Sequence, residues 1–190
     1  ENTLISGDAI ALDRYLDVLK KRDVFCSKVD VDYASHSPQM DIVTDALRIE
    51  LRSLEPKAGD IPIYSTTTGD IISGSQMTGD YWAKNIRNEV LFYQQIQLML
   101  KDEYTHFIEI SPHPIACYSI NRCMEERQVK PNGCVIGTLK RDEDTQACFT
   151  DGLAQLYLSG FAPDWQQLYQ TGGMQVNLPL QTYYKQRYWL

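Results

Sequence analysis

The sequence predicts an α/β fold in which short strands alternate with longer helices. Three observations support this prediction. Short apolar segments bounded by turn residues, typical of buried strands, alternate along the 190 residues with segments of helical periodicity. Residues suited to capping a helix precede several of the helical segments. Hydrophobic residues make up 43% of the chain and charged residues 23%, which is enough apolar material to build a core.

The first elements predict a strand–helix–strand unit. Residues 4–8 have the pattern of a short strand, and Asp8 is suited to cap the helix that follows. Residues 24–33 alternate their side chains as a second strand would. We therefore expect a β-α-β piece of a small sheet domain. Four side chains form the apolar face of its helix: Leu12, Tyr15, Leu16 and Leu19.

A larger α/β part is expected from residue 38 onward. Its first helix runs until Pro56, and a strand at 61–65 precedes a Gly/Ser/Thr-rich loop that extends through Gly79. The remaining predicted elements are a helical region at 80–101 interrupted near Asn88, a strand at 106–110, a helix at 112–126, a strand at 134–139 and a helix at 145–159 with Phe149, Leu153, Leu156 and Tyr157 facing inward. Strands that alternate with helices predict a layered α/β domain.

The C-terminal residues differ in character from the rest. Asp164 is suited to cap a short helix around Trp165, which residues 171–173 then end. Residues 176–190 have no helical period and contain four large aromatic side chains, so they cannot form a core of their own. We expect this tail to lie extended against a neighbouring surface.

Composition and charge exclude several classes of protein. A net charge of -7 argues against non-specific nucleic-acid binding, which needs a basic surface. No apolar run approaches the ~20 residues that a membrane-spanning helix needs, and the first residues do not resemble a secretory or transit signal. The five cysteines are odd in number and lack CxxC pairing, which favours reduced thiols in a cytoplasmic protein over disulfides or a zinc site. We expect no metal.

His36 is the strongest candidate for a functional residue. It follows a strand-like segment and immediately precedes Ser37, a good helix N-cap, and Pro38, which suits the first helical position. The positive end of the following helix favours a neutral imidazole, the form that accepts a proton. The position therefore suits a general base, although a loop histidine that ties down the backbone has the same sequence pattern.

Residues 31–37 resemble the histidine motif of the acyltransferase domains of modular polyketide synthases. Other stretches match this family in the same order along the chain, and together they cover nearly all of it. They are residues 5–8, then Tyr81 and Trp82 with Asn85, Arg87 and Val90, then residues 107–114, then Asp164 and Trp165 with Leu168, and finally residues 178–181 and 186–189, which resemble the linker that follows this domain.

The resemblance implies a partial malonyl-CoA:acyl-carrier-protein transacylase-like fold of the α/β class. Residues 1–36 would be part of a ferredoxin-like small subdomain, and residues 37–160 the C-terminal part of the large α/β subdomain. Residues 161–190 would be the linker after the acyltransferase, which runs back to the ketosynthase of the same synthase. The chain would then comprise the C-terminal part of the domain and its linker.

The resemblance also implies a Ser/His mechanism. An acyl-CoA acylates a serine, and the thiol of the phosphopantetheine arm on an acyl carrier protein then takes the acyl group, with His36 as the base in both steps. No metal or covalently bound cofactor is implied. The family's serine lies on a GxSxG-type elbow upstream of the histidine, and this pentapeptide does not occur here. The serine would come from an N-terminal part of the domain. The alternative is a non-catalytic docking or scaffold domain of a polyketide synthase.

Four further residues are implied to contact the substrate. In the family, the Tyr33-Ala34-Ser35 sequence before the histidine goes with methylmalonyl extender units, because the small Ser35 leaves space for the α-methyl branch. One methyl group is worth only ~1–3 kcal/mol, so we expect a preference and not absolute selection. His113 is a candidate for lining the cleft, and capping of its own turn is the structural alternative. Arg87 could reach a CoA phosphate or form a salt bridge.

Overall fold

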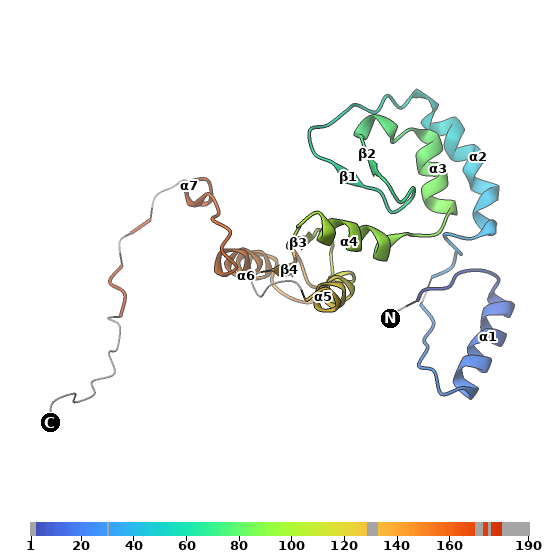
Figure 1. Cartoon of the computed structure of the whole chain (residues 1–190), viewed down its shortest axis with the longest axis horizontal. Coiled ribbons are helices and arrows are strands. Elements are labelled where there is room, and N and C mark those ends of the chain that lie inside the picture. Colours follow the sequence, from blue (N-terminus) through green and yellow to red (C-terminus); the bar gives the residue numbers. More distant parts are fainter. Residues whose placement is uncertain (1–2, 30, 129–132, 170–172, 175, 180–190) are drawn as a thin grey trace.

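The computed structural model describes residues 3–29, 31–128, 133–169, 173–174 and 176–179. These residues form short strands and helices that follow one another in an extended series (Figure 1). The order of the elements is α1 (Ala9–Lys21), η1 (Pro38–Met40), α2 (Asp41–Glu50), η2 (Leu51–Ser53), β1 (Ile63–Tyr64), β2 (Ile71–Ile72), η3 (Gly74–Gln76), α3 (Gly79–Arg87), α4 (Phe92–Lys101), β3 (His106–Glu109), α5 (Cys117–Glu126), β4 (Cys134–Gly137), α6 (Thr145–Leu158) and α7 (Trp165–Leu168).

The hydrophobic core lies around the parallel strands β3 and β4. These strands pair from His106 with Cys134 to Glu109 with Gly137, and α5 forms the connection between them. A parallel pair needs such a crossover, and its strands become buried when helices cover the sheet. The buried residues of this core come from α4, β3 and α5: Ile96, Leu100, Phe107, Ile120 and Cys123. The predicted strands at 106–110 and 134–139 are therefore confirmed, each shorter at its C-terminal end.

Helix α6 packs closely against β4 through a glycine. A Cβ atom at Gly152 would stand 3.2 Å from the Cδ1 atom of Ile136, so an alanine here would require the Ile136 side chain to shift by a few tenths of an ångström. Leu156 on the same helix is buried, as predicted. Phe149 and Tyr157 are each 53% exposed, so the prediction that they face inward is wrong for the described chain. Among the described residues, only the side of α6 that carries Gly152 and Leu156 is buried.

Helices α2 and α3 pack side by side, and the antiparallel hairpin of β1 and β2 lies beside α3 (Figure 1). Ala83 on α3 is fully buried, and Thr44 on α2 is buried too. Gly79 permits the close approach at the start of α3, since a Cβ atom there would lie 3.1 Å from the Cβ atom of Leu51. The predicted helical region at 80–101 is confirmed, with its break near Asn88 separating α3 from α4.

Helix α1 begins as predicted, but its predicted flanking strands do not form. The Ala11 N–H donates to the Asp8 carboxylate at 2.9 Å, which confirms the N-cap. Residues 4–8, 24–29 and 31–33 contain no strand, and Phe25 is 94% exposed. Backbone groups form a strand only when a neighbouring strand satisfies them. The described residues supply no such neighbour to either segment, so the alternating pattern alone does not produce a sheet.

No helix among the described residues is long and apolar enough to cross a membrane.

Candidate active site

His36 lies at the start of the segment that leads into α2. The Gln39 N–H donates to the hydroxyl of Ser37 at 3.2 Å, which confirms Ser37 as the N-cap, and Pro38 occupies the first position of η1. The Ser37 hydroxyl in turn donates to the Ala34 carbonyl oxygen at 2.8 Å. Ser37 is only 2% exposed, so this pair of bonds fixes the turn around His36.

The imidazole ring of His36 is held by the end of α3. Its Nδ1 atom lies 2.8 Å from the carbonyl oxygen of Asn88. A carbonyl oxygen can only accept a hydrogen bond, so Nδ1 must carry the proton. In the neutral ring Nε2 is then unprotonated and free to accept a proton. This is the tautomer that a general base requires at Nε2.

The backbone of His36 is strained. Its φ angle is 60°, in the left-handed region that residues with a Cβ atom adopt rarely. Such a conformation costs about 1–3 kcal/mol and persists only where neighbouring contacts impose it. One of these contacts is the hydrogen bond of 2.8 Å from the His36 N–H to the carbonyl oxygen of Ile86. Strained residues of this kind are concentrated at functional sites.

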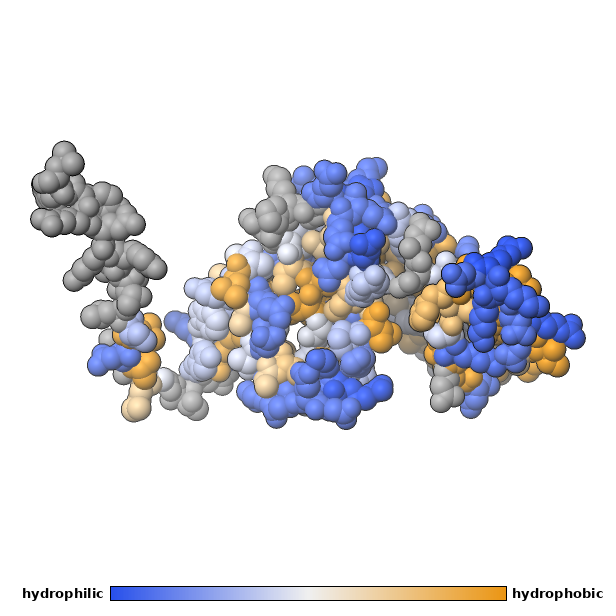
Figure 2. All heavy atoms as spheres, turned by 90° about the horizontal axis from the view of Figure 1, so that it is seen from below, coloured by the Kyte–Doolittle hydropathy of each residue, from blue (hydrophilic) through white to orange (hydrophobic). Residues whose placement is uncertain are grey.

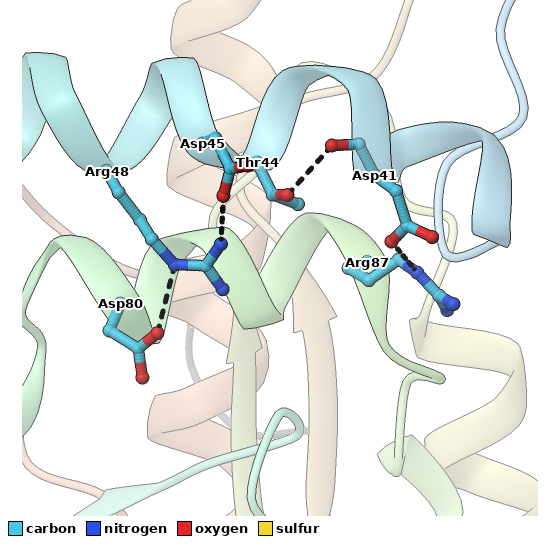
Figure 3. A network of polar contacts seen from close by, with 6 residues as sticks. All are labelled: Asp41, Thr44, Asp45, Arg48, Asp80 and Arg87. Carbon is cyan, nitrogen blue, oxygen red and sulfur yellow. Dashed lines mark hydrogen bonds and ion pairs between the residues drawn. The ribbon is translucent and has the colours of Figure 1, made fainter.

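The end of α3 is itself fixed by two side chains from the family-like motif. Arg87 forms an ion pair with Asp41, the first residue of α2, so Arg87 supports the salt-bridge interpretation (Figure 3). Asn85 donates from Nδ2 to the hydroxyl oxygen of Thr67 at 2.8 Å. These contacts connect α3 to α2 and to the loop of the β1–β2 hairpin. Both side chains therefore support the carbonyl groups that hold His36.

The seam between α2 and α3 carries further charged side chains (Figure 3). Arg48 on α2 donates to Asp45 on its own helix and to Asp80 on α3, at 2.9 and 3.1 Å. Lys84 also pairs with Asp80. Because all of these groups are solvent-exposed, each pair contributes little on its own. They orient two helices that already pack through Ala83.

A buried polar cluster lies beneath α3. The Ser65 hydroxyl is 3.0 Å from the Tyr81 hydroxyl, and it accepts from the backbone N–H groups of Thr67 and Thr68, each at 3.2 Å. Ser65 is only 1% exposed. The sequence analysis placed Ser65 at the end of the predicted strand at 61–65 and the following residues in a loop, and it assigned the Ser65 hydroxyl no role. The available signal was the small polar sequence at 65–69, typical of side chains that bond to a tight turn.

The substrate motif before His36 lies partly open to solvent. Tyr33 is 63% exposed, whereas Ala34 and Ser35 are half-buried. The carbonyl oxygen of Ser35 accepts a hydrogen bond of 2.5 Å from the hydroxyl of Ser6. Ser6 belongs to a stretch that matched the family, but sequence reasoning assigned it no role. No sequence signal connects a serine hydroxyl to a backbone carbonyl 29 positions away.

The other two histidines have structural contacts. Nδ1 of His113 accepts a hydrogen bond of 3.3 Å from the Arg141 N–H, and the His113 carbonyl accepts from the Ser111 hydroxyl at 2.8 Å. The ring of His113 therefore bonds to the backbone at Arg141, 28 positions further along the chain, and only its carbonyl oxygen bonds within its own turn. Both ring nitrogens of His106 lie 3.0 Å from hydroxyl oxygens, those of Thr105 and Ser159. Among the described residues, no hydrogen bond joins either ring to residues 33–36.

Glu109 organises the turn that begins α5. Its carboxylate accepts hydrogen bonds from the backbone N–H groups of Ile115, Ala116 and Cys117, at 2.8, 2.9 and 2.9 Å. The Ser111 hydroxyl also donates to it at 3.0 Å. Desolvation by itself raises the pKa of Glu109, but these donors outweigh it and hold the pKa at about 2. The predicted helix at 112–126 consequently starts only at Cys117.

The described cysteines with a shifted pKa are poorly suited to act as nucleophiles. Burial, followed by the neighbouring Glu109, raises the pKa of Cys117 to about 11. Burial also raises the pKa values of Cys123 and Cys134. A nucleophilic cysteine needs a lowered pKa. Within the described ranges, no group of three or more His, Cys, Asp or Glu side chains could hold a metal ion.

Two hollows of about 280 and 420 Å³ flank α1, and His36 lines neither of them. The site therefore consists of an oriented histidine at the surface, held by α3 and by the start of α1.

The comparisons with known proteins identify the family of the chain. A family model described as an acyl transferase domain matches residues 1–163. The spectinabilin polyketide synthase system protein NorA' of Streptomyces orinoci is 33% identical over 190 residues, which is 100% of this chain and 5% of that protein. The acyltransferase domain from module 8 of the salinomycin polyketide synthase superimposes with a TM-score of 0.80 at 31% identity, covering 84% of this chain and 37% of that one.

The fold extends to a more distant protein. An acyl-carrier-protein S-malonyltransferase from Burkholderia pseudomallei matches with a TM-score of 0.63 at 17% identity, covering 78% of this chain and 45% of that one. The predicted malonyl-CoA:acyl-carrier-protein transacylase-like fold of the α/β class is thus confirmed for the part present. The chain spans only a small fraction of the polyketide synthase relative and less than half of these solved chains. The chain belongs to the acyl transferase domain family, in the form found in modular polyketide synthases.

Proposed function

We propose that this chain supplies the histidine half of an acyltransferase site that loads an extender unit from CoA onto an acyl carrier protein. The observation that supports this most directly is the geometry of His36. Its ring is anchored through Nδ1, its Nε2 has no hydrogen-bond partner among the described residues, and its strained backbone is held by α3. An oriented histidine with an unprotonated Nε2 is the proton acceptor that acyl transfer by a Ser/His pair requires.

The proposed reaction has two acyl-transfer steps. Nε2 of His36 takes the proton from a serine hydroxyl as its oxygen attacks the thioester carbonyl of the acyl-CoA. The carbon–sulfur bond breaks, and the imidazolium returns the proton to the leaving CoA thiolate. In the second step, Nε2 takes the proton from the phosphopantetheine thiol of the carrier protein, whose sulfur attacks the serine ester. The serine oxygen then leaves and recovers the proton from His36.

The serine is proposed to come from a preceding part of the domain. Exposed apolar side chains on the described residues support this proposal, since solvent-exposed apolar patches mark surfaces that contact another unit. Ile110, directly after β3, is 87% exposed, and Ile115 is 80% exposed. Figure 2 shows such hydrophobic residues on the viewed face, in the central part of the molecule and at the end that holds α1. In addition, β3 pairs with one strand only among the described residues.

The extender unit is proposed to be methylmalonyl. The support is the Tyr33-Ala34-Ser35 motif directly before His36, in which Ser35 is half-buried beside the catalytic residue. His113 remains a proposal as a residue of the cleft. Because its Nδ1 accepts a hydrogen bond, its Nε2 carries the proton and can donate to a substrate oxygen.

The proposed partners are the acyl carrier protein and the ketosynthase of the same synthase. The linker at 161–190 is proposed to reach the ketosynthase. The structure describes α7 within it, where Asp164 accepts from the N–H groups of Gln166 and Gln167 at 3.0 and 3.1 Å and so confirms the predicted cap. Most of residues 176–190, including the four aromatic side chains, lie outside the described residues.

A non-catalytic scaffold domain is the second candidate. The observation in its favour is the absence of a GxSxG sequence from these 190 residues. The nearest string, residues 73–76, forms η3 with a capping box between Ser73 and Gln76, and not a strand-to-helix elbow. A scaffold has no use for a free Nε2 on a strained histidine, so the first candidate is preferred.

The test is acyl loading by a polypeptide that contains this chain and the rest of its domain. The protein is incubated with methylmalonyl-CoA, and its intact mass is measured before and after. We expect a gain of one acyl group, followed by its transfer to a carrier protein. His36→Ala should lower this turnover by about 10²–10⁴-fold. Transfer at the wild-type rate by the variant, or no acyl adduct on the wild type, would favour the scaffold.

A further inference from the structure

The peptide unit between Ser35 and His36 is held from both sides. The Ser35 carbonyl oxygen accepts a hydrogen bond of 2.5 Å from the hydroxyl of Ser6. The His36 N–H donates to the carbonyl oxygen of Ile86 at 2.8 Å. A peptide unit is planar, so two bonds on its opposite polar groups fix its rotation about the chain. The two partners come from segments on opposite sides of the motif in the sequence.

The rotation of this peptide unit decides the backbone conformation at His36. The φ angle of 60° is defined by the orientation of this unit relative to the His36 Cα atom. A peptide unit that could rotate would let His36 relax to an ordinary backbone conformation, because the left-handed region is unfavourable for histidine. The ring would then leave its position at the carbonyl oxygen of Asn88.

Ser6 is well placed to act as a fixed donor. It stands two residues before Asp8, whose carboxylate caps α1 through the N–H of Ala11 at 2.9 Å. The Asp8 carbonyl also accepts the first backbone bond of the helix, from the N–H of Leu12 at 2.9 Å. The Ser6 side chain is half-buried, which protects its hydrogen bond from competition with water.

We propose that Ser6 is a positioning residue for His36. Its hydroxyl holds the Ser35–His36 peptide unit in the orientation that keeps the imidazole on Asn88 and leaves Nε2 as the proton acceptor. Ser6 acts through the backbone and touches neither the substrate nor the reacting atoms. The inference rests on the proposed function of His36 as the general base.

The first test compares three serine variants in a polypeptide that contains this chain and the rest of its domain. Ser6→Ala should lower the kcat of methylmalonyl transfer by about tenfold and leave KM within about twofold, because the base is misplaced but substrate binding is not. Ser6→Thr keeps a hydroxyl on the same carbon and should restore most of the activity. Ser27→Ala removes an exposed serine of the same region and should transfer at the wild-type rate.

The second test observes the ring directly. In a protein with ¹⁵N-labelled histidine, the His36 signals are those that disappear in His36→Gln. Wild type should show a protonated Nδ1 and an unprotonated Nε2, and Ser6→Ala should move both signals toward a mixture of tautomers. Ser27→Ala should not move them. A merely structural role of Ser6 would lower the unfolding midpoint and leave these signals unchanged.

The outcomes separate this inference from the proposed function. If His36→Gln transfers at the wild-type rate, the proposed function is wrong. If His36→Gln is inactive while Ser6→Ala keeps both the wild-type kcat and the wild-type ring signals, only the role of Ser6 is overturned. Should Ser6→Ala not fold, Ser6→Cys keeps the size and donates a weaker hydrogen bond. Ser6→Cys must then show a partial loss of kcat, and wild-type kcat for it would overturn the role.

Discussion

The Nδ1 atom of His36 lies 2.8 Å from the carbonyl oxygen of Asn88, a residue 52 positions further along the chain. This contact sets the tautomer of the ring, because a backbone carbonyl oxygen can accept a hydrogen bond but cannot donate one. The orienting group is a main-chain atom, so it does not depend on the identity of the Asn88 side chain. It depends on where α3 ends, and therefore on the contacts that fix this end.

Glu109→Gln should destabilise the folded protein. The amide has one oxygen in place of two, so it cannot accept from Ile115, Ala116, Cys117 and Ser111 together. We expect a loss of about 1–3 kcal/mol in the free energy of unfolding, measured by denaturant unfolding at neutral pH. Glu103→Gln, at an exposed position, is the matched control and should stay within about 0.5 kcal/mol of wild type.

The same carboxylate predicts a pH dependence of stability. The pKa of Glu109 is about 2 in the folded protein, below its ordinary value of 4.5. Its contribution is therefore fully present above about pH 4.5 and is lost as the pH falls from there toward 2. Wild type should lose stability over this interval more steeply than Glu109→Gln. If the free energy of unfolding fell equally in the two proteins between about pH 5 and about pH 2, the stated role of Glu109 would be wrong.

Breaking the ion pair between Arg87 and Asp41 should have a small effect on stability. Both side chains are partly exposed, at 34% and 62%, and such pairs contribute about 0.2–1 kcal/mol. A double-mutant cycle with Arg87→Met and Asp41→Asn should give a coupling energy in this range. The alternative role, contact with a CoA phosphate, predicts that Arg87→Met raises the KM for acyl-CoA while Asp41→Asn does not. We expect the two variants to have similar KM values for acyl-CoA.

Enlarging Ser35 should change the preferred extender unit. A phenylalanine would fill the space proposed for the α-methyl branch, so Ser35→Phe should favour malonyl over methylmalonyl. The ratio of the two kcat/KM values should shift by about 10–100-fold, the range expected for one methyl group. Competition between the two acyl-CoA substrates measures this ratio. Ser35→Thr, a smaller change, should shift the ratio less.

The isolated 190-residue chain should be poorly stable. Ile42, Leu158 and Ile110 are each more than 80% exposed, and α1 contains no buried residue. Each exposed residue of this size leaves about 1.5–3 kcal/mol of burial energy unused. Thermal unfolding followed by circular dichroism should show a broad transition near or below room temperature. A sharp transition at high temperature would instead support a self-contained scaffold domain.

The helix starts that carry a capping side chain were predictable because their signals are local, whereas the start of α5 at Cys117, which has no such cap, was predicted five residues too early. Asp8, Ser37 and Asp164 each cap a helix through their own side chains, so neighbouring residues are sufficient to place these caps. The strand predictions succeeded at β3 and β4, which pair with each other. They failed at residues 4–8 and in the described part of 24–33, because a strand also needs a partner that its own sequence does not contain.

In the candidate site too, features with a local sequence signal were predictable and features that depend on distant segments were not. Residues 31–37 carried a recognisable motif, and the sequence alone identified His36 and its cap. The groups that hold His36 are the Ile86 and Asn88 carbonyls, which have no sequence signature because every residue has a carbonyl group. The hydroxyls of Ser6 and Thr67 could be read in the sequence as polar side chains. Their partners depend on how distant segments pack.

The sequence by itself thus determined the family, the starts of the helices that Asp8, Ser37 and Asp164 cap, and the candidate base, because capping residues and the histidine motif act over a few neighbouring positions. Only the tertiary structure decided the tautomer of His36, its left-handed backbone and the clamp by Ser6 and Ile86. These features arise where the start of α1, the histidine segment and the end of α3 meet. Hydrogen bonds between segments so far apart form only after the helices have packed.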